Sequence, residues 1–168
     1  MIRFLISVFI SPAVIFVIQL MILFPLALTI IDTAPKLRFD HLEKELDTVE
    51  GMSIILIAWG VALEDRNDLR RIFKLVGAAD EVRQGLLDHD CHAAGLGLLI
   101  LGLFTEMCVQ AIRLPDSIVY TSGIERYVLA AALGILVICG WIILNHIYLL
   151  SRLAARSRAL AVDEAGDE

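Results

Sequence analysis

The feature that most constrains this chain is one acidic residue inside an apolar segment of membrane length. Segment 91–113 is almost entirely apolar, yet it contains Glu106. At about 1.5 Å per helical residue, the segment is long enough to cross a hydrocarbon core of about 30 Å. Ionisable side chains inside such helices are rare, and they normally face the interior of a bundle or a water-filled cavity. We therefore expect other helices to shield Glu106.

Three further apolar runs supply these helices, and most charged residues lie between the runs. The chain is 58% hydrophobic, against about half in an ordinary soluble domain. This pattern predicts an all-α fold, a polytopic transmembrane four-helix bundle. A single domain, 1–152, is expected to precede a charged, disordered tail, 153–168. The expected spans are about 2–31, 48–64, 91–113 and 127–150.

The first two spans depart from ideal length. The first is longer than a bilayer requires, so we expect it to tilt, kink or overhang, with Pro12 and Pro25 as natural kink points and an end before Pro35. The second apolar run, 51–63, is short for a span. The preceding residues 42–49 carry apolar side chains at helical spacing, which favours an extended, spanning helix. A re-entrant segment in a three-span protein is the alternative.

The basic residues predict the orientation of the bundle. In a four-span arrangement, nine of the fourteen Lys and Arg residues fall at the termini and in the loop between spans two and three. Because cytoplasmic loops of membrane proteins carry the excess of basic residues, both termini and this loop are expected in the cytoplasm. The simplest location is a bacterial inner, or plasma, membrane.

The loop between spans two and three predicts a short basic amphipathic helix. Apolar residues recur at helical spacing from Leu69, and the polar positions hold Arg66, Arg70, Arg71 and Lys74. Such a helix can lie on an anionic leaflet, with its apolar face at the acyl boundary. The alternative is a cytosolic helix packed against its neighbours.

Glu106 is the first candidate site. Gln110 and Arg113 follow it on one face of the third span, and Gln19 of the first span is expected at a similar depth. With Ser53 as a further possible partner, these residues could form a site for a proton or cation. The alternatives are a structural hydrogen bond that fixes helix packing, or a glutamate that pairs with Arg113 near the membrane surface.

The second candidate site lies at the cytoplasmic end of the third span. Histidine, cysteine and carboxylate side chains are common ligands of zinc and related metals. The fourth span brings a further histidine to this depth, where solvated interfacial side chains are the alternative, and haem held by His92 and His146 is a remoter one. The metal-ligand candidates are His89, Cys91, His92, His146 and Glu64.

Small residues predict close helix packing. Ala93 with Gly97, and Ala130 with Gly134, are spaced four residues apart, a pattern that allows helices to approach closely. The pattern fits packing within the chain and packing between copies equally well. The cysteines form no CxxC pair, and we interpret them as small core residues.

These patterns favour a protein without enzymatic activity. The sequence contains no GxSxG, P-loop or HExxH motif, and no basic face suited to nucleic acid. We expect an assembly or accessory subunit of a membrane complex, without a cofactor, whose partners are the lipid bilayer and either further copies or other membrane subunits. The alternatives are a small oligomeric proton or cation transporter or channel that uses Glu106, and a metal- or haem-binding membrane enzyme.

Overall fold

A computed structural model describes residues 11–37, 43–72, 81–114 and 123–166, and the regular structure within them is entirely helical. The elements are α2 (Pro12–Lys36), α3 (Glu43–Glu64), α4 (Arg66–Ile72), α5 (Glu81–Arg113) and α6 (Glu125–Gly166). Helices α2, α3, α5 and α6 each contain a stretch long and apolar enough to cross a membrane. The predicted all-helical protein with four potential spans is confirmed.

Helix α2 lies further along the chain than the first apolar run predicts. Pro12 occupies the first helical turn, where a missing N–H costs nothing, so Pro12 begins the described helix and does not kink it. At the other end the helix continues through Pro35 to Lys36, which corrects the expected break. Lys36 donates to Asp32, one turn earlier, at 2.6 Å, and this pair helps to hold the last turn.

Helix α3 confirms that the residues before the short apolar run extend it. The helix has 22 residues and therefore measures about 33 Å, enough to cross the hydrocarbon core. It is the least hydropathic of the four candidate spans, yet it has the largest buried share, 44% against 28% for α2 and α5. The central position of α3 is consistent with its lower hydropathy, because its neighbours shield its polar groups.

The last two long helices continue beyond their apolar runs. Within α5, the stretch Leu87–Arg113 is the candidate span. Gly123, with φ +87°, makes the turn before α6, because glycine adopts positive φ without strain. Helix α6 runs to Gly166 and so extends into the segment expected as a charged tail. The Ala, Leu and Arg content of this segment favours helix.

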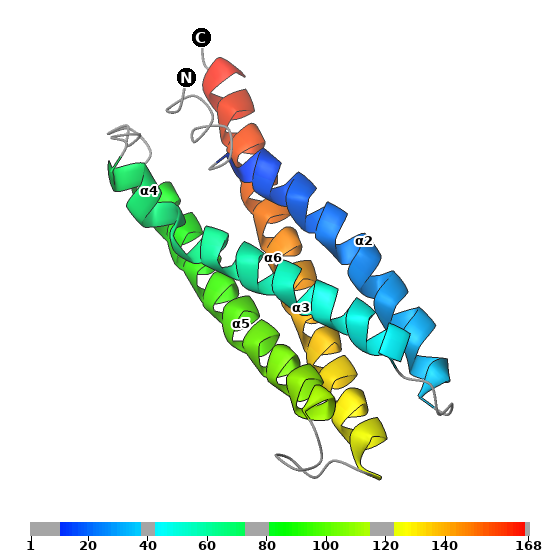
Figure 1. Ribbon diagram of the computed structural model, residues 1–168. Coiled ribbons are helices and arrows are strands. Elements are labelled where there is room, and N and C mark those ends of the chain that lie inside the picture. Colours follow the sequence, from blue (N-terminus) through cyan, green and yellow to red (C-terminus); the bar gives the residue numbers. More distant parts are fainter. Residues whose placement is uncertain (1–10, 38–42, 73–80, 115–122, 167–168) are drawn as a thin grey trace.

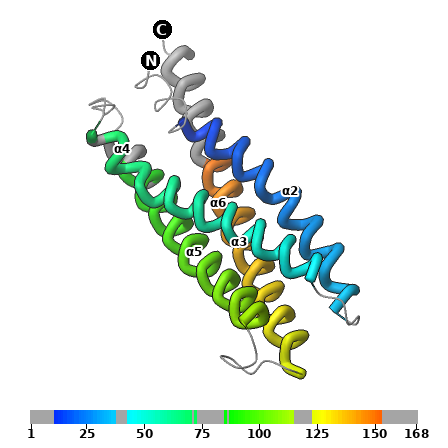
Figure 2. Tube along the Cα trace, viewed as in Figure 1, coloured from blue at the N-terminus to red at the C-terminus, as the bar shows by residue number. Residues whose placement is uncertain are grey.

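The four long helices form an elongated bundle (Figure 1). The start of α2, the end of α3, α4 and the start of α5 lie at one end, which we call the α4 end; the start of α6 lies at the opposite end. Helix α3 packs chiefly against α5, α5 also packs against α6, and α2 packs against α6. The tube view shows α3 crossing between α5 and α2 (Figure 2). The core at these contacts includes the fully buried Val49, Leu56, Leu98, Leu136 and Ile143.

Glycines bring the backbones of α3 and α5 into contact. A Cβ atom added to Gly95 would lie 2.7 Å from both the carbonyl oxygen of Gly60 and the amide nitrogen of Glu64. One added to Gly102 would lie 2.8 Å from Cγ1 of Ile57. Such approaches exclude any side chain, and small residues allow them between membrane helices. This glycine crossing separates two clusters of polar side chains.

Candidate functional site

The first cluster surrounds Glu106 and lies towards the end of the bundle opposite α4. Oε2 of Glu106 lies 2.5 Å from the hydroxyl oxygen of Ser53 on α3. Oε1 accepts a hydrogen bond of 2.7 Å from the side-chain amide of Gln110, one turn along α5. The structure thus brings together Glu106 and two of its predicted partners. Both carboxyl oxygens are engaged in contacts within the chain.

The same cluster continues towards the end of the bundle. The amide of Gln110 also donates to Oε1 of Glu50, at 3.2 Å. Arg113 pairs with Glu50 at 2.8 Å and with Asp47. Arg113 therefore pairs with acids of α3, and not with Glu106 as one of the alternatives expected; Gln110 connects Glu50 to Glu106. We refer to these residues, Asp47, Glu50, Ser53, Glu106, Gln110 and Arg113, as the Glu106 cluster.

Gln19, the third predicted partner of Glu106, lies in a different place. Its side chain is fully buried, and its amide nitrogen lies 2.6 Å from Nδ1 of His146 on α6. Nε2 of the same ring lies 3.5 Å from Sγ of Cys91 on α5. We expected Gln19 and Glu106 at a similar depth because the first span was expected to occupy residues 2–31. With α2 running to Lys36, Gln19 lies near the α4 end.

Beside Gln19, Cys91 and His146, a buried cluster of ion pairs joins α4 and α5. Arg66 and Arg70 both donate to Asp88, Arg70 at 2.6 Å. The two arginine side chains are 4% and 6% exposed. Burial lowers the pKa of the Arg66 guanidinium, and the neighbouring Cys91 and Asp88 oppose this shift. Together with Gln19, Cys91 and His146, these residues form the α4-end cluster.

The buried arginines differ from the arrangement expected of a membrane-surface helix. Arg66 and Arg70 face α5, as in the alternative in which the helix packs against its neighbours, whereas Ile72 is 70% exposed. The difference has a physical cause, because Asp88 offers one carboxylate between two guanidinium groups one helical turn apart. The side chain of Arg71 and the whole of Lys74 lie outside the described residues.

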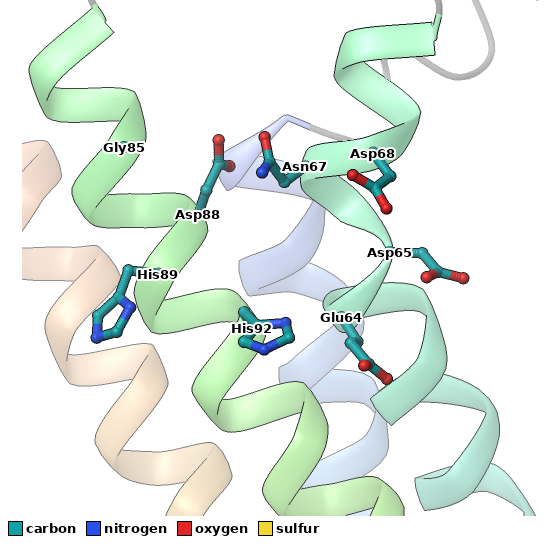
Figure 3. A pocket seen from close by; sticks show the side chains of 8 residues that line it. All are labelled: Glu64, Asp65, Asn67, Asp68, Gly85, Asp88, His89 and His92. Atoms are coloured by element: carbon teal, nitrogen blue, oxygen red, sulfur yellow. The ribbon is translucent and has the colours of Figure 1, made fainter.

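A polar cavity of about 470 Å³ opens next to the α4-end cluster (Figure 3). The end of α3, α4 and the first turns of α5 line it. Figure 3 shows the rings of His89 and His92 pointing in different directions from α5. The lining residues are Glu64, Asp65, Asn67, Asp68, Gly85, Asp88, His89 and His92.

The predicted metal ligands are divided between two environments. His89, His92 and Glu64 line the cavity, whereas Cys91 and His146 are buried and contact each other. Within the described residues, no group of three or more His, Cys, Asp or Glu side chains is placed to hold a metal ion. The expected meeting of the third and fourth spans at this depth does occur, as the contact between Cys91 and His146. A ring that uses both nitrogens on protein partners is best explained as a packing element.

The small residues are also divided. A Cβ atom on Gly97 would lie 3.3 Å from Ile142 of α6, so this member of the first predicted pair packs within the chain, whereas Ala93 is exposed. A Cβ atom on Gly134 would meet nothing within 4 Å, and Ala130 is exposed as well.

Comparisons of the sequence with family models, with curated proteins and with solved structures find no match.

Proposed function

We propose that the protein is a non-enzymatic subunit of a membrane assembly, and that α6 contacts the partner. The observation that carries this proposal is the unused pair Ala130 and Gly134 on the exposed face of α6. The glycines of the α3–α5 crossing are committed to packing inside the chain, whereas this pair has no such partner among the residues that the structure describes. In membranes, small residues four apart support close contact between helices.

The residues that continue this face have the spacing of a helix seam. Exposed side chains recur at intervals of three and four along α6, the spacing of helices packed in a left-handed pair. Trp141 is 72% exposed and Tyr127 is 76% exposed. We refer to this set as the α6 seam: Tyr127, Ala130, Gly134, Val137, Trp141, Leu144 and Tyr148.

The interior of the bundle supports a role at its surface. The carboxyl oxygens of Glu106 and Asp88 contact groups of the same chain. Cys91 and His146, which could in principle act as nucleophile and base, are closed off by packing, with 0% and 2% exposure. These polar groups are therefore poorly available to bind a substrate, and the exposed helix faces are the surfaces best placed to bind a partner.

Co-purification from native membranes tests the proposal. Tagged protein is isolated in mild detergent, and Gly134→Leu is compared with Gly51→Leu. Gly51 is a matched control because it lies exposed in α3 and an added Cβ there also meets nothing within 4 Å. We expect the wild type and Gly51→Leu to retain a partner and Gly134→Leu to lose it. A monomeric wild type, or equal recovery with both variants, would contradict the proposal. Two differently tagged copies would reveal whether the partner is a second copy.

The second candidate is a proton or cation pathway that uses Glu106. The Glu106 cluster favours it, because hydrogen bonds lead from Glu106 towards the end of the bundle. The glycine crossing and the buried Leu56 and Leu98 lie between this cluster and the α4-end cluster, which argues against a continuous path through one chain. Flux measurements in liposomes, with the wild type and Glu106→Gln, test the idea, and wild-type protein without flux would refute it.

A further inference from the structure

The hydroxyl group of Ser53 lies between two acceptors. Its oxygen is 2.7 Å from the backbone carbonyl oxygen of Glu50 and 2.5 Å from Oε2 of Glu106. Both distances are those of O–H···O hydrogen bonds. A serine hydroxyl carries one hydrogen, so it can donate in only one of these two contacts. In the other contact, the hydrogen must come from the group that faces Ser53.

The chemistry of the two partners decides where that hydrogen lies. A backbone carbonyl can only accept, whereas a carboxyl group donates when it is protonated. A serine within a helix commonly donates to the carbonyl three or four residues earlier, which here is that of Glu50. We propose that Glu106 is a proton-binding site of the bundle, in which the protonated carboxyl donates to Ser53 while Ser53 donates to the backbone of Glu50.

The second oxygen of Glu106 fits the same assignment. Oε1 accepts from the amide of Gln110 at 2.7 Å, as the carbonyl oxygen of a neutral carboxyl would. The other amide hydrogen of Gln110 serves Oε1 of Glu50 at 3.2 Å. Every hydrogen in this part of the cluster then has one acceptor, and each contact has one hydrogen.

Charged side chains of all four long helices lie at this end of the bundle. Asp47 and Glu50 of α3 share the guanidinium of Arg113 of α5. At this end of the bundle, Lys36 of α2 is engaged by Asp32 and by Glu45 of α3, and α6 begins with Glu125 and Arg126.

Proton binding would therefore be coupled to the contact between α3 and α5. Loss of the proton leaves Ser53 with two acceptors for one hydrogen and places a negative charge near Glu50. Both effects weaken the contact between the helices on this side of the glycine crossing. This site and its ligand, the proton, do not depend on the partner proposed for the α6 seam.

Infrared difference spectroscopy of the purified protein in lipid nanodiscs tests the inference. At neutral pH we expect the wild type to show the C=O stretch of a protonated carboxylic acid, shifted in D₂O. Glu106→Gln should lack this band. Glu43→Gln, at an exposed glutamate of α3, should retain it. A wild type without the band, or a band that survives in Glu106→Gln, would overturn the inference.

Ser53→Ala provides a second test that does not alter Glu106. Removing the hydroxyl takes away the acceptor of the carboxyl hydrogen, so the band should persist at a shifted frequency. An unshifted band would also overturn the inference. Glu106→Gln should fold like the wild type by circular dichroism, because a glutamine amide can donate to Ser53 and accept from Gln110 in the same pattern.

Discussion

Gly95→Ala gives the most direct test of the glycine crossing. The new methyl group would lie 2.7 Å from the carbonyl oxygen of Gly60 and 2.7 Å from the amide nitrogen of Glu64. Ordinary contacts of this kind begin near 3.4 Å, so α3 and α5 would have to separate locally by about 0.7 Å. Both opposing atoms belong to the backbone and cannot rotate away. Overpacking in a rigid core typically costs about 1–3 kcal/mol, and we expect the upper part of this range.

The measurement is reversible unfolding in mixed micelles, followed by circular dichroism, with Gly134→Ala as the control. The control adds the same methyl group where nothing lies within 4 Å. It should leave the free energy of unfolding unchanged or raise it by up to about 1 kcal/mol, because alanine favours helix over glycine. Equal stability of Gly95→Ala and Gly134→Ala would refute the close contact between α3 and α5.

Three further predictions use the same unfolding assay or a labelling assay. Asp88→Ala leaves two buried arginines without their shared carboxylate and should lower the free energy of unfolding by about 3–5 kcal/mol. The matched change Asp47→Ala, at a side chain that is 75% exposed, should cost less than about 1 kcal/mol. Gln19→Ala leaves Nδ1 of His146 buried without its partner and should cost about 1–3 kcal/mol; a neutral result would mean that water replaces the amide. Cys91 should resist N-ethylmaleimide in the folded protein and react on unfolding, as judged by mass spectrometry.

The existence of the four long helices was predictable because long apolar runs leave few alternatives in a membrane. The second span illustrates the reasoning, since a run of thirteen apolar residues is too short by itself. Apolar side chains at helical spacing before it predicted the extension, and α3 begins at Glu43. Ser53 and Gln110 were also predictable as partners of Glu106, because a buried acid needs hydrogen-bond partners and few polar residues exist at that depth.

The depth of Gln19 could not be predicted in the same way. Hydropathy places the centre of an apolar run, whereas packing and local pairs decide which part of the run forms the span. Asp32 and Lys36 extend α2 beyond Pro35, and the shift moves Gln19 to the α4 end. The amphipathic pattern of α4 had a similar ambiguity, because a basic face suits both an anionic leaflet and a buried carboxylate. Asp88 decides between them, and only the folded arrangement of α4 on α5 shows that it is within reach.

The Glu106 cluster and the glycine crossing together determine the register of α3 on α5. A slide of either helix by one turn, about 5.4 Å, would separate Glu106 from Ser53 and Arg113 from its two acids. It would also replace glycine by bulkier residues where the backbones touch. Apolar packing alone would oppose such a slide only weakly. Lipid tails are about as apolar as leucine side chains, so exchanging a helix contact for a lipid contact costs little. The contacts that oppose it follow one another in antiparallel order: Asp47 with Arg113, Glu50 with Gln110, Ser53 with Glu106, and Gly60 with Gly95. These contacts therefore select one alignment of α3 on α5, which apolar contacts alone would select only weakly. Proton release at Glu106 would weaken the alignment only at the end of the bundle that holds the Glu106 cluster.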